Sequence, residues 1–292
     1  MAESPSHKFG QIIGDTLEAA ILPLLVTFAI KHRLYVDHKG PRPCRKGLKC
    51  LWTDLHGNTH DLDSVLESGG TGYKKGAPVA FIEIAWRRHT KHARNKAQEI
   101  QGAIEPLAET YSSLGPFKGA VLAGGFTDGA INQLRSLGFT VLFFTYKMII
   151  SAFEVVGIDA FYDEDTADQE CQQKVDKWNS LTKLDKERIP KELLKSNWSN
   201  VERFMASLES SIARKVDRII VLPLHGNSFE VKTVNDAVRF IESYVENIAP
   251  RKFERYEIQI RFTNGNEIIG KFNDKISAIE FLCIYEPTHT SA

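Results

Sequence analysis

Two carboxylates twenty residues apart carry the strongest chemical signal in the sequence. Asp63 stands in "THDLDSVLE" and Glu83 in "APVAFIEIAW", two segments whose composition is typical of β-strands. Alternate residues of a strand share a face, so two neighbouring strands can point both carboxylates into one space. Burying them together is costly unless a cation or a shared proton relieves the repulsion. Because magnesium is commonly bound by one or two carboxylates plus a substrate phosphate, the pair predicts a Mg²⁺ site that Mn²⁺ could also fill.

Directly after Glu83, the apolar strand gives way to a run of basic residues in "FIEIAWRRHTKHARNK" (81–96). No further acid appears before Glu99. Hydrolysis of a phosphodiester at a metal also needs donors for the phosphates on either side of the scissile bond. We therefore predict that this run contacts nucleic acid through Arg87, Arg88, Lys91 and Arg94.

Two other interpretations of these segments remain open. In the first, the acids of residues 61–67 face solvent on an edge strand while Glu83 pairs with a nearby arginine. In the second, a set of cysteines and histidines binds zinc, although its spacing does not match the short Cys-x₂₋₄-Cys of usual zinc sites. That set is Cys44, Cys50, His56 and His60.

The strands and helices expected from the sequence must position these groups. Their order predicts an α/β protein with a central mixed sheet flanked by helices. Strands and helices alternate along much of the chain, which implies a mixed or parallel sheet with helices on both sides. No internal repeat is evident. The expected elements are helices at 9–32, 90–112 and 234–245, strands at 77–86, 118–124, 140–146 and 217–224, and hairpins around residues 50–67 and 256–272.

Three segments are expected along the chain. Residues 1–162 contain the sheet and the predicted site. Residues 163–213 are helical and densely charged, which is typical of a solvated insertion. Residues 214–292 are expected to complete the same domain with a strand, a helix and a C-terminal hairpin.

Composition limits the partners and the location of the protein. The 292 residues include 37 basic and 37 acidic side chains, so a polyanion must be met by a local patch rather than by net charge. Four cysteines without a signal peptide favour a reduced, cytoplasmic protein. The longest apolar run, residues 19–30, is too short to span a bilayer and predicts a core helix, so no membrane association is expected. Without a P-loop, we expect no nucleotide cofactor.

Together these residues resemble the PD-(D/E)XK nuclease superfamily, which includes most type II restriction endonucleases and many recombination and repair nucleases. Asp63 in "HDLDSVLE" would be the family's Asp, and Glu83, across a glycine-rich loop, its second acid. Glu18 matches in position the acid that many members carry on their first helix. The resemblance covers approximately residues 10–150. It implies a restriction-endonuclease-like core and a metal site at Asp63, Glu83 and Glu18.

The sequence departs from the family pattern at Ala85, where the family carries the lysine that orients or activates the attacking water. Members of the superfamily also place such groups on the following helix. There, Lys96 lies about 60° from the centre of the predicted apolar stripe and can bring its ammonium to the carboxylates. We therefore expect Lys96 to be the displaced lysine, with Lys91 as the second choice and a surface position for Lys96 as the alternative. The stripe itself is formed by Ala93, Ala97, Ile100, Ile104 and Leu107.

The resemblance implies a Mg²⁺-dependent endonuclease that hydrolyses double-stranded DNA. The leading hypothesis is a site-specific type II restriction enzyme, and enzymes of this kind usually act as homodimers. The first alternative is a nuclease-like DNA-binding protein that has lost catalysis, as Ala85 would allow. The second is a repair or recombination nuclease that acts on ends or branched DNA.

Overall fold

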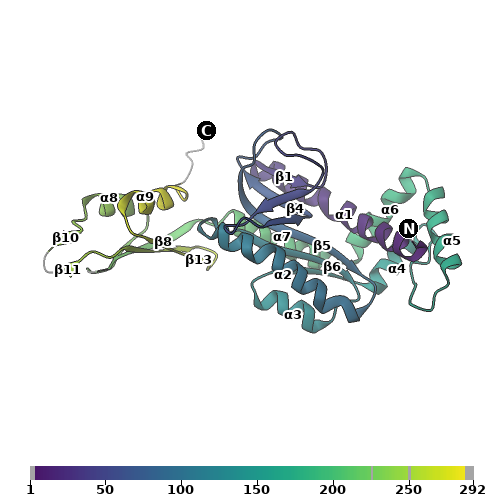
Figure 1. Cartoon of the computed structure of the whole chain (residues 1–292). Coiled ribbons are helices and arrows are strands. Elements are labelled where there is room, and N and C mark those ends of the chain that lie inside the picture. Colours follow the sequence, from purple (N-terminus) through teal and green to yellow (C-terminus); the bar gives the residue numbers. More distant parts are fainter. Residues whose placement is uncertain (1–3, 225, 249–250, 287–292) are drawn as a thin grey trace. The chain divides into compact units, whose positions relative to one another are not determined.

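The computed structural model describes residues 4–224, 226–248 and 251–286. The chain divides into two compact units (Figure 1). Unit 1 contains residues 1–110 and 116–208, and unit 2 contains residues 111–115 and 209–292. Each unit has its own sheet and its own hydrophobic core.

Unit 1 is an α/β structure with a mixed five-stranded sheet flanked by helices, as the sequence predicted. The first three strands in the order β1-β4-β5-β6-β7 pair antiparallel, and the last three pair parallel. The strand predicted to be apolar on both faces, β5, lies in the middle. The five strands are β1 (Leu34–His38), β4 (Ser64–Ser68), β5 (Ala77–Arg87), β6 (Phe117–Gly124) and β7 (Thr140–Thr145).

The helices nearest the sheet follow the predicted order. α1 (Pro5–His32) contacts β1 and β5, and after the short turn η1 (Thr90–His92), α2 (Ala93–Thr110) contacts β5 and β6. α3 (Asp128–Ser136) packs on α2 and β7, and α4 (Tyr146–Glu154) packs on β6 and β7. Among the described helices, α1 alone has the length and composition to cross a membrane. Half of its most apolar stretch is nevertheless buried within the protein, as in the core helix that the sequence predicted.

The predicted first hairpin forms, but the prediction of one continuous strand over residues 59–67 is wrong. β2 (Cys50–Thr53) pairs with β3 (Thr59–Leu62) in a separate two-stranded sheet. The chain leaves β3 at Asp63 and enters β4, whose two sides are already paired with β1 and β5. Because β4 has no free side for β2, the hairpin must leave the main sheet. Asp63 therefore lies at the bend between two sheets.

Residues 163–213 differ from a solvated insertion, because one side of each helix is buried. They form α5 (Asp168–Ser180), α6 (Lys183–Ser196) and α7 (Trp198–Ile212), and both α5 and α6 pack on α1. The charged residues seen in the sequence occupy the outer faces. The buried sides include Cys171, Val175, Ile189, Leu193, Phe204 and Leu208, and the segment up to residue 208 belongs to unit 1.

Unit 2 contains a four-stranded antiparallel sheet in the order β13-β12-β8-β9. The sequence analysis assigned residues 214–292 to the same domain as the core, whereas in the structure they belong to a unit with its own core. The strands alternate between buried and more exposed residues, as a sheet covered on one face does. The elements are η2 (Ser112–Leu114), β8 (Val216–Pro223), β9 (Phe229–Val231), α8 (Val234–Ser243), β10 (Asn247–Ile248), β11 (Arg251–Lys252), β12 (Tyr256–Phe262), β13 (Glu267–Phe272) and α9 (Lys275–Cys283).

The main elements of unit 2 repeat a hairpin followed by a helix. In the first copy β8 and β9 precede α8, and in the second β12 and β13 precede α9. β8 and β12 pair antiparallel in the centre, which leaves β9 and β13 at the two edges. The sequence analysis found no repeat because the copies share only short matches, such as "GN" in the turns and "ND" before or within the helix start.

Candidate active site

A cleft of about 900 Å³ along the C-terminal half of β5 gathers most of the predicted site residues. Its walls come from α1, from the bend between β3 and β4, from β5 and from α2. The predicted residues that line it are Glu18, Asp63, Glu83, Arg87, Arg88 and Lys96. Segments far apart in the sequence thus bring three carboxylates and three cations into one space.

Asp63 and Glu83 lie side by side through the pairing of β4 with β5. Ser64 stands opposite Ile82 in this pairing, so the residues one position further, Asp63 and Glu83, face each other. The Ile84 N–H donates to Asp63 Oδ2 at 2.6 Å, and the Asp63 N–H donates to Glu83 Oε1 at 3.3 Å. Only 6% of Glu83 is exposed. The backbone therefore fixes both carboxylates at one end of the strand pair.

The two carboxylates carry the electrostatic cost that the sequence predicted. Burial, with the nearby charge of Asp63, raises the pKa of Glu83 to about 8, although Lys96 opposes the shift. Burial also raises the pKa of Asp63, against the hydrogen bond from Ile84 and the charge of Lys96. At neutral pH the pair therefore retains a proton, held chiefly by the more buried Glu83. A cation placed between the two carboxylates would offset the repulsion between their negative charges.

Glu18 supplies a third carboxylate from α1. Burial raises its pKa, and the charges of Asp63 and Asp15 add to the shift while Lys39 opposes it. Glu18 and Asp63 are thus close enough to repel each other. Glu18 therefore lines the cleft from α1.

Lys96 reaches the cleft from α2, whose buried stripe is the predicted one. Ala93, Ala97, Ile100, Ile104 and Leu107 are all fully buried. The Lys96 side chain is 19% exposed, and its Nζ lies 3.3 Å from a Glu99 carboxylate oxygen. The charge of Lys96 lowers the pKa of both Asp63 and Glu83. The ammonium is therefore placed to act on the carboxylate pair.

Part of the basic run in residues 81–96 lines the cleft, and part lies outside it. Arg87 lines the cleft with an amino group 3.5 Å from Glu99, and Arg88 stacks over the Tyr162 ring at 4.5 Å. Lys91 and Arg94 do not line the cleft. Two of the four predicted phosphate contacts therefore line the same cleft as the carboxylates.

An acidic loop around Glu164 lies against the outer part of this run. The Glu164 carboxylate bonds the Lys91 ammonium and lies 3.9 Å from His89 Nε2. The hydrogen bond from Lys91, with the charges around it, lowers the pKa of Glu164. The loop thus occupies cations that the sequence analysis assigned to phosphate.

The neighbouring acids of the segment do not join the pair. Asp61 is exposed at the rim of the cleft and lies 3.0 Å from Lys49 Nζ. Glu67, expected on the same face as Asp63, is fully buried and bonded to Arg42 at 2.5 and 3.0 Å. The alternative of an exposed edge strand is wrong, because β4 is an inner strand.

Among the lining residues that sequence reasoning missed are Lys39, Tyr162 and Trp86. Lys39 follows β1, and Tyr162 precedes the acidic loop, so only the folding of distant segments brings these two residues to the cleft. Trp86 lies on β5 itself, but its apolar strand assigned it to the core; it is half-buried, with its ring 5.2 Å from that of Tyr146.

The zinc alternative gains no support from the described part of the chain. There, no group of three or more histidines, cysteines or acids is placed to hold a metal ion. Cys44 and Cys50 are free thiols, and His60 Nε2 lies 2.9 Å from a carboxylate oxygen of Asp54. The carboxylate pair is a different donor set, of the two-residue kind that magnesium uses.

Comparison with known proteins adds no relative to this picture. No family model, no curated protein and no solved structure matches the chain. Functional conclusions about the protein therefore come from the residues of the cleft.

Proposed function

We propose that the protein is a divalent-metal-dependent nuclease that hydrolyses phosphodiester bonds of double-stranded DNA. The observation that carries this proposal is the convergence of Asp63 and Glu83 at one end of a strand pair. They lie in a cleft that also contains Lys96, Arg87 and Arg88. Carboxylates that bind a hard cation, beside donors for phosphate, are the groups that metal-assisted phosphodiester hydrolysis needs.

The order of the elements supports a core of the PD-(D/E)XK type. The helix with Glu18 comes first, then the segment with Asp63, the strand with Glu83, the helix with Lys96 and two more strands. This is the order that the resemblance implied. The restriction-endonuclease-like core is thus part of the proposal.

The donor set at the carboxylate pair fits Mg²⁺ or Mn²⁺. Its ligands are oxygens. Burial raises both pKa values, and the charge of Asp63 adds to the shift of Glu83, which a divalent ion would oppose. Asp63 and Glu83 would hold the ion. Glu18 lines the same cleft, but the three acids are not placed to hold one ion together, so water and a substrate phosphate would supply the remaining oxygens. When bound, such an ion would polarise a phosphoryl oxygen and make a water more acidic.

The chain's own side chains have separate tasks in this proposal. The Lys96 ammonium orients the attacking water beside the carboxylate pair, because it is half-buried and acts on both acids. Arg87 and Arg88 donate hydrogen bonds to phosphates next to the scissile one. Arg87 must first exchange its contact with Glu99 for the phosphate.

Cleavage of supercoiled plasmid by the purified protein tests the proposal. We expect nicked and linear products with Mg²⁺ or Mn²⁺ and none after chelation of the metal. Discrete fragments from linear DNA would identify a site-specific restriction enzyme, whereas preference for ends or forks would identify a repair or recombination nuclease. The proposal is wrong if no metal supports cleavage of circular, linear or forked DNA.

The alternative of a DNA-binding protein without catalysis is favoured by Ala85, which stands where the family carries its lysine. The same assays separate the two functions. DNA binding without metal-dependent cleavage would favour the binding protein. Sedimentation of the protein with and without DNA tests the homodimer that restriction enzymes of this kind usually form.

A further inference from the structure

Lys39 lies at the same end of the sheet as the two carboxylates. β1 ends at His38, which stands opposite Ser64, the first residue of β4, so Lys39 and Asp63 are the next residues beyond this pair. Hydrogen bonds hold Asp63 beside Glu83 at the same end of β5. Lys39, Asp63 and Glu83 all line the cleft at this end of the sheet.

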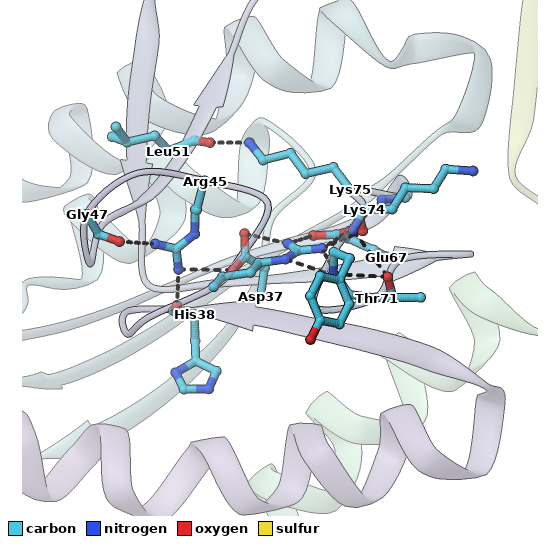
Figure 2. A network of polar contacts seen from close by, with 12 residues as sticks. Asp37, His38, Arg45, Gly47, Leu51, Glu67, Thr71, Lys74 and Lys75 are labelled. Carbon is cyan, nitrogen blue, oxygen red and sulfur yellow. Dashed lines mark hydrogen bonds and ion pairs between the residues drawn. The ribbon is translucent and has the colours of Figure 1, made fainter.

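The backbone of Lys39 is held on both sides. On one side, Arg45 donates to the His38 carbonyl at 2.7 Å and to Asp37 at 3.1 Å (Figure 2). On the other, the Gly40 N–H donates to the Leu48 carbonyl at 2.7 Å. The backbone of Lys39 is thus fixed, and its side chain is exposed.

A buried ion network anchors this segment to the sheet. Arg42 lies 2.8 Å from Asp37 and 2.5 Å from Glu67, and the three side chains are at most 2% exposed. Arg42 also donates to the carbonyls of Thr71 and Lys74, which follow β4 (Figure 2). Buried ion pairs often contribute little net stability, because desolvation offsets their attraction. In this inference, the network fixes the position of the chain next to Lys39 rather than adding to stability.

Lys39 differs from the other lysines of the cleft because its ammonium is not engaged. Lys96 contacts Glu99, and Lys49 contacts Asp61. Within the described ranges, no residue forms a hydrogen bond or an ion pair with Lys39. Its charge nevertheless acts on Glu18 and Asp63. Lys39 is therefore a cation available for a ligand at the carboxylates.

We propose that Lys39 is a second catalytic lysine, whose ammonium binds a non-bridging oxygen of the scissile phosphate from the β1 side of the cleft. This inference rests on the proposed nuclease function and assigns Lys39 a task distinct from that of Lys96. In the reaction, the water oxygen forms a bond to phosphorus and loses a proton to solvent. The bond from phosphorus to the leaving sugar oxygen breaks, and that oxygen takes a proton from solvent to become a hydroxyl. Lys39 keeps its protons and stabilises the negative charge on the phosphoryl oxygens.

Single-turnover cleavage by Lys39→Ala, compared with Lys49→Ala, tests this role. Lys49 is the matched control, because it is a lysine at the rim of the same cleft that is already paired with Asp61. We expect Lys39→Ala to slow cleavage about 100-fold and to change the DNA dissociation constant less than about threefold. Lys49→Ala should change neither quantity more than about threefold. Lys39→Arg, which keeps the charge, should recover much of the lost rate.

Each outcome decides for or against the proposal. Cleavage by Lys39→Ala at the wild-type rate would overturn the role of Lys39 and leave the nuclease function standing. Equal losses of binding and cleavage would show a simple DNA contact and would also overturn it. A wild-type protein that cleaves no DNA with any metal would refute the proposed function, and the role of Lys39 with it. Thermal unfolding checks that Lys39→Ala is folded.

Discussion

Folding and metal binding favour different protonation states of the Asp63 and Glu83 carboxylates. Folding favours a protonated Glu83, because burial and the charge of Asp63 oppose its ionisation. Metal binding needs the ionised form of both groups. A divalent ion therefore changes the protonation of the pair as it binds, and protons should be released.

Removing either ligand charge should abolish cleavage. We expect Asp63→Asn and Glu83→Gln to lower the plasmid cleavage rate by at least about 1,000-fold, because each removes a ligand of the proposed ion. The control is Asp61→Asn, since Asp61 lies in the same segment but is exposed and paired with Lys49. Retained cleavage in the Glu83 variant would place the active site elsewhere in the chain.

The raised pKa of Glu83 predicts how the stability of the metal-free protein depends on pH. An acid whose pKa is higher in the folded state stabilises the fold at low pH, and this contribution is lost as pH rises towards the folded value. We therefore expect the free energy of unfolding to fall between about pH 4.5, the ordinary value, and about pH 8. Urea unfolding in a chelator measures it, and Glu83→Gln should flatten the profile. A wild-type profile that rises over this window would contradict the assignment.

Lys96 and Arg87 both contact Glu99, but removing each side chain should affect different steps. Lys96→Ala should lower turnover about 100-fold with little change in DNA affinity, because its ammonium faces the carboxylates. Arg87→Ala should instead weaken DNA binding and lower the dependence of log affinity on log salt by about one unit. Binding titrations at several salt concentrations, together with single-turnover rates, measure both effects. Equal losses of binding in the two variants would count against the role of Lys96.

Local periodicity placed two groups of the candidate site, because each depends on one element. Glu83 follows from alternation along a buried strand, and Lys96 follows from its angle to the buried stripe of a helix. Alternation along one strand over residues 59–67 did not place Asp63 correctly, because the chain bends there between β3 and β4. Lys39 could not be found in this way. Its position beside Asp63 depends on the pairing of β1 with β4. Glu164 contacts Lys91 across 73 residues of sequence, which no local pattern contains.

At the scale of elements, the acidic loop before α5 covers part of the basic run after β5. Glu164 bonds Lys91, and Tyr162 stacks under Arg88. A DNA phosphate that approached Lys91 would have to replace the Glu164 carboxylate. The loop therefore competes with substrate for the same cation.

Removing the charge of Glu164 should strengthen DNA binding. We expect Glu164→Gln to lower the dissociation constant for DNA about threefold, since an exposed ion pair is weak in water. Asp165→Asn is the matched control, because it removes the same charge from the next residue of the exposed loop. Fluorescence anisotropy at low salt measures both variants. If the two variants bind equally, general repulsion rather than the Lys91 contact accounts for the change.

At the scale of the whole chain, the order of elements was predictable but their division between two sheets was not. The strand at 217–224 and the hairpin at 256–272 were expected to complete the same domain as the central sheet. Their alternating burial instead belongs to a sheet with one covered face. Alternation shows that a strand is half-buried, but it does not show which sheet the strand joins.

Two adjacent isoleucines in β13 can test whether unit 2 has an independent core. Ile268 is 7% exposed within the core of unit 2, whereas Ile269 is 58% exposed on the uncovered face. Ile268→Ala should cost about 2–5 kcal/mol of stability, because it leaves a cavity. Ile269→Ala should stay within about 0.5 kcal/mol of wild type.

Hydrogen exchange locates the loss within the chain. If the core of unit 2 is independent, Ile268→Ala should lower amide protection in β8 and β12 and leave β5 and β6 unchanged, because those strands belong to a different core. Equal loss of protection in both sheets would instead mean that the units unfold together. In that case the candidate active-site cleft of unit 1 would depend on unit 2 for its stability, and Ile268→Ala would also reduce the proposed cleavage activity.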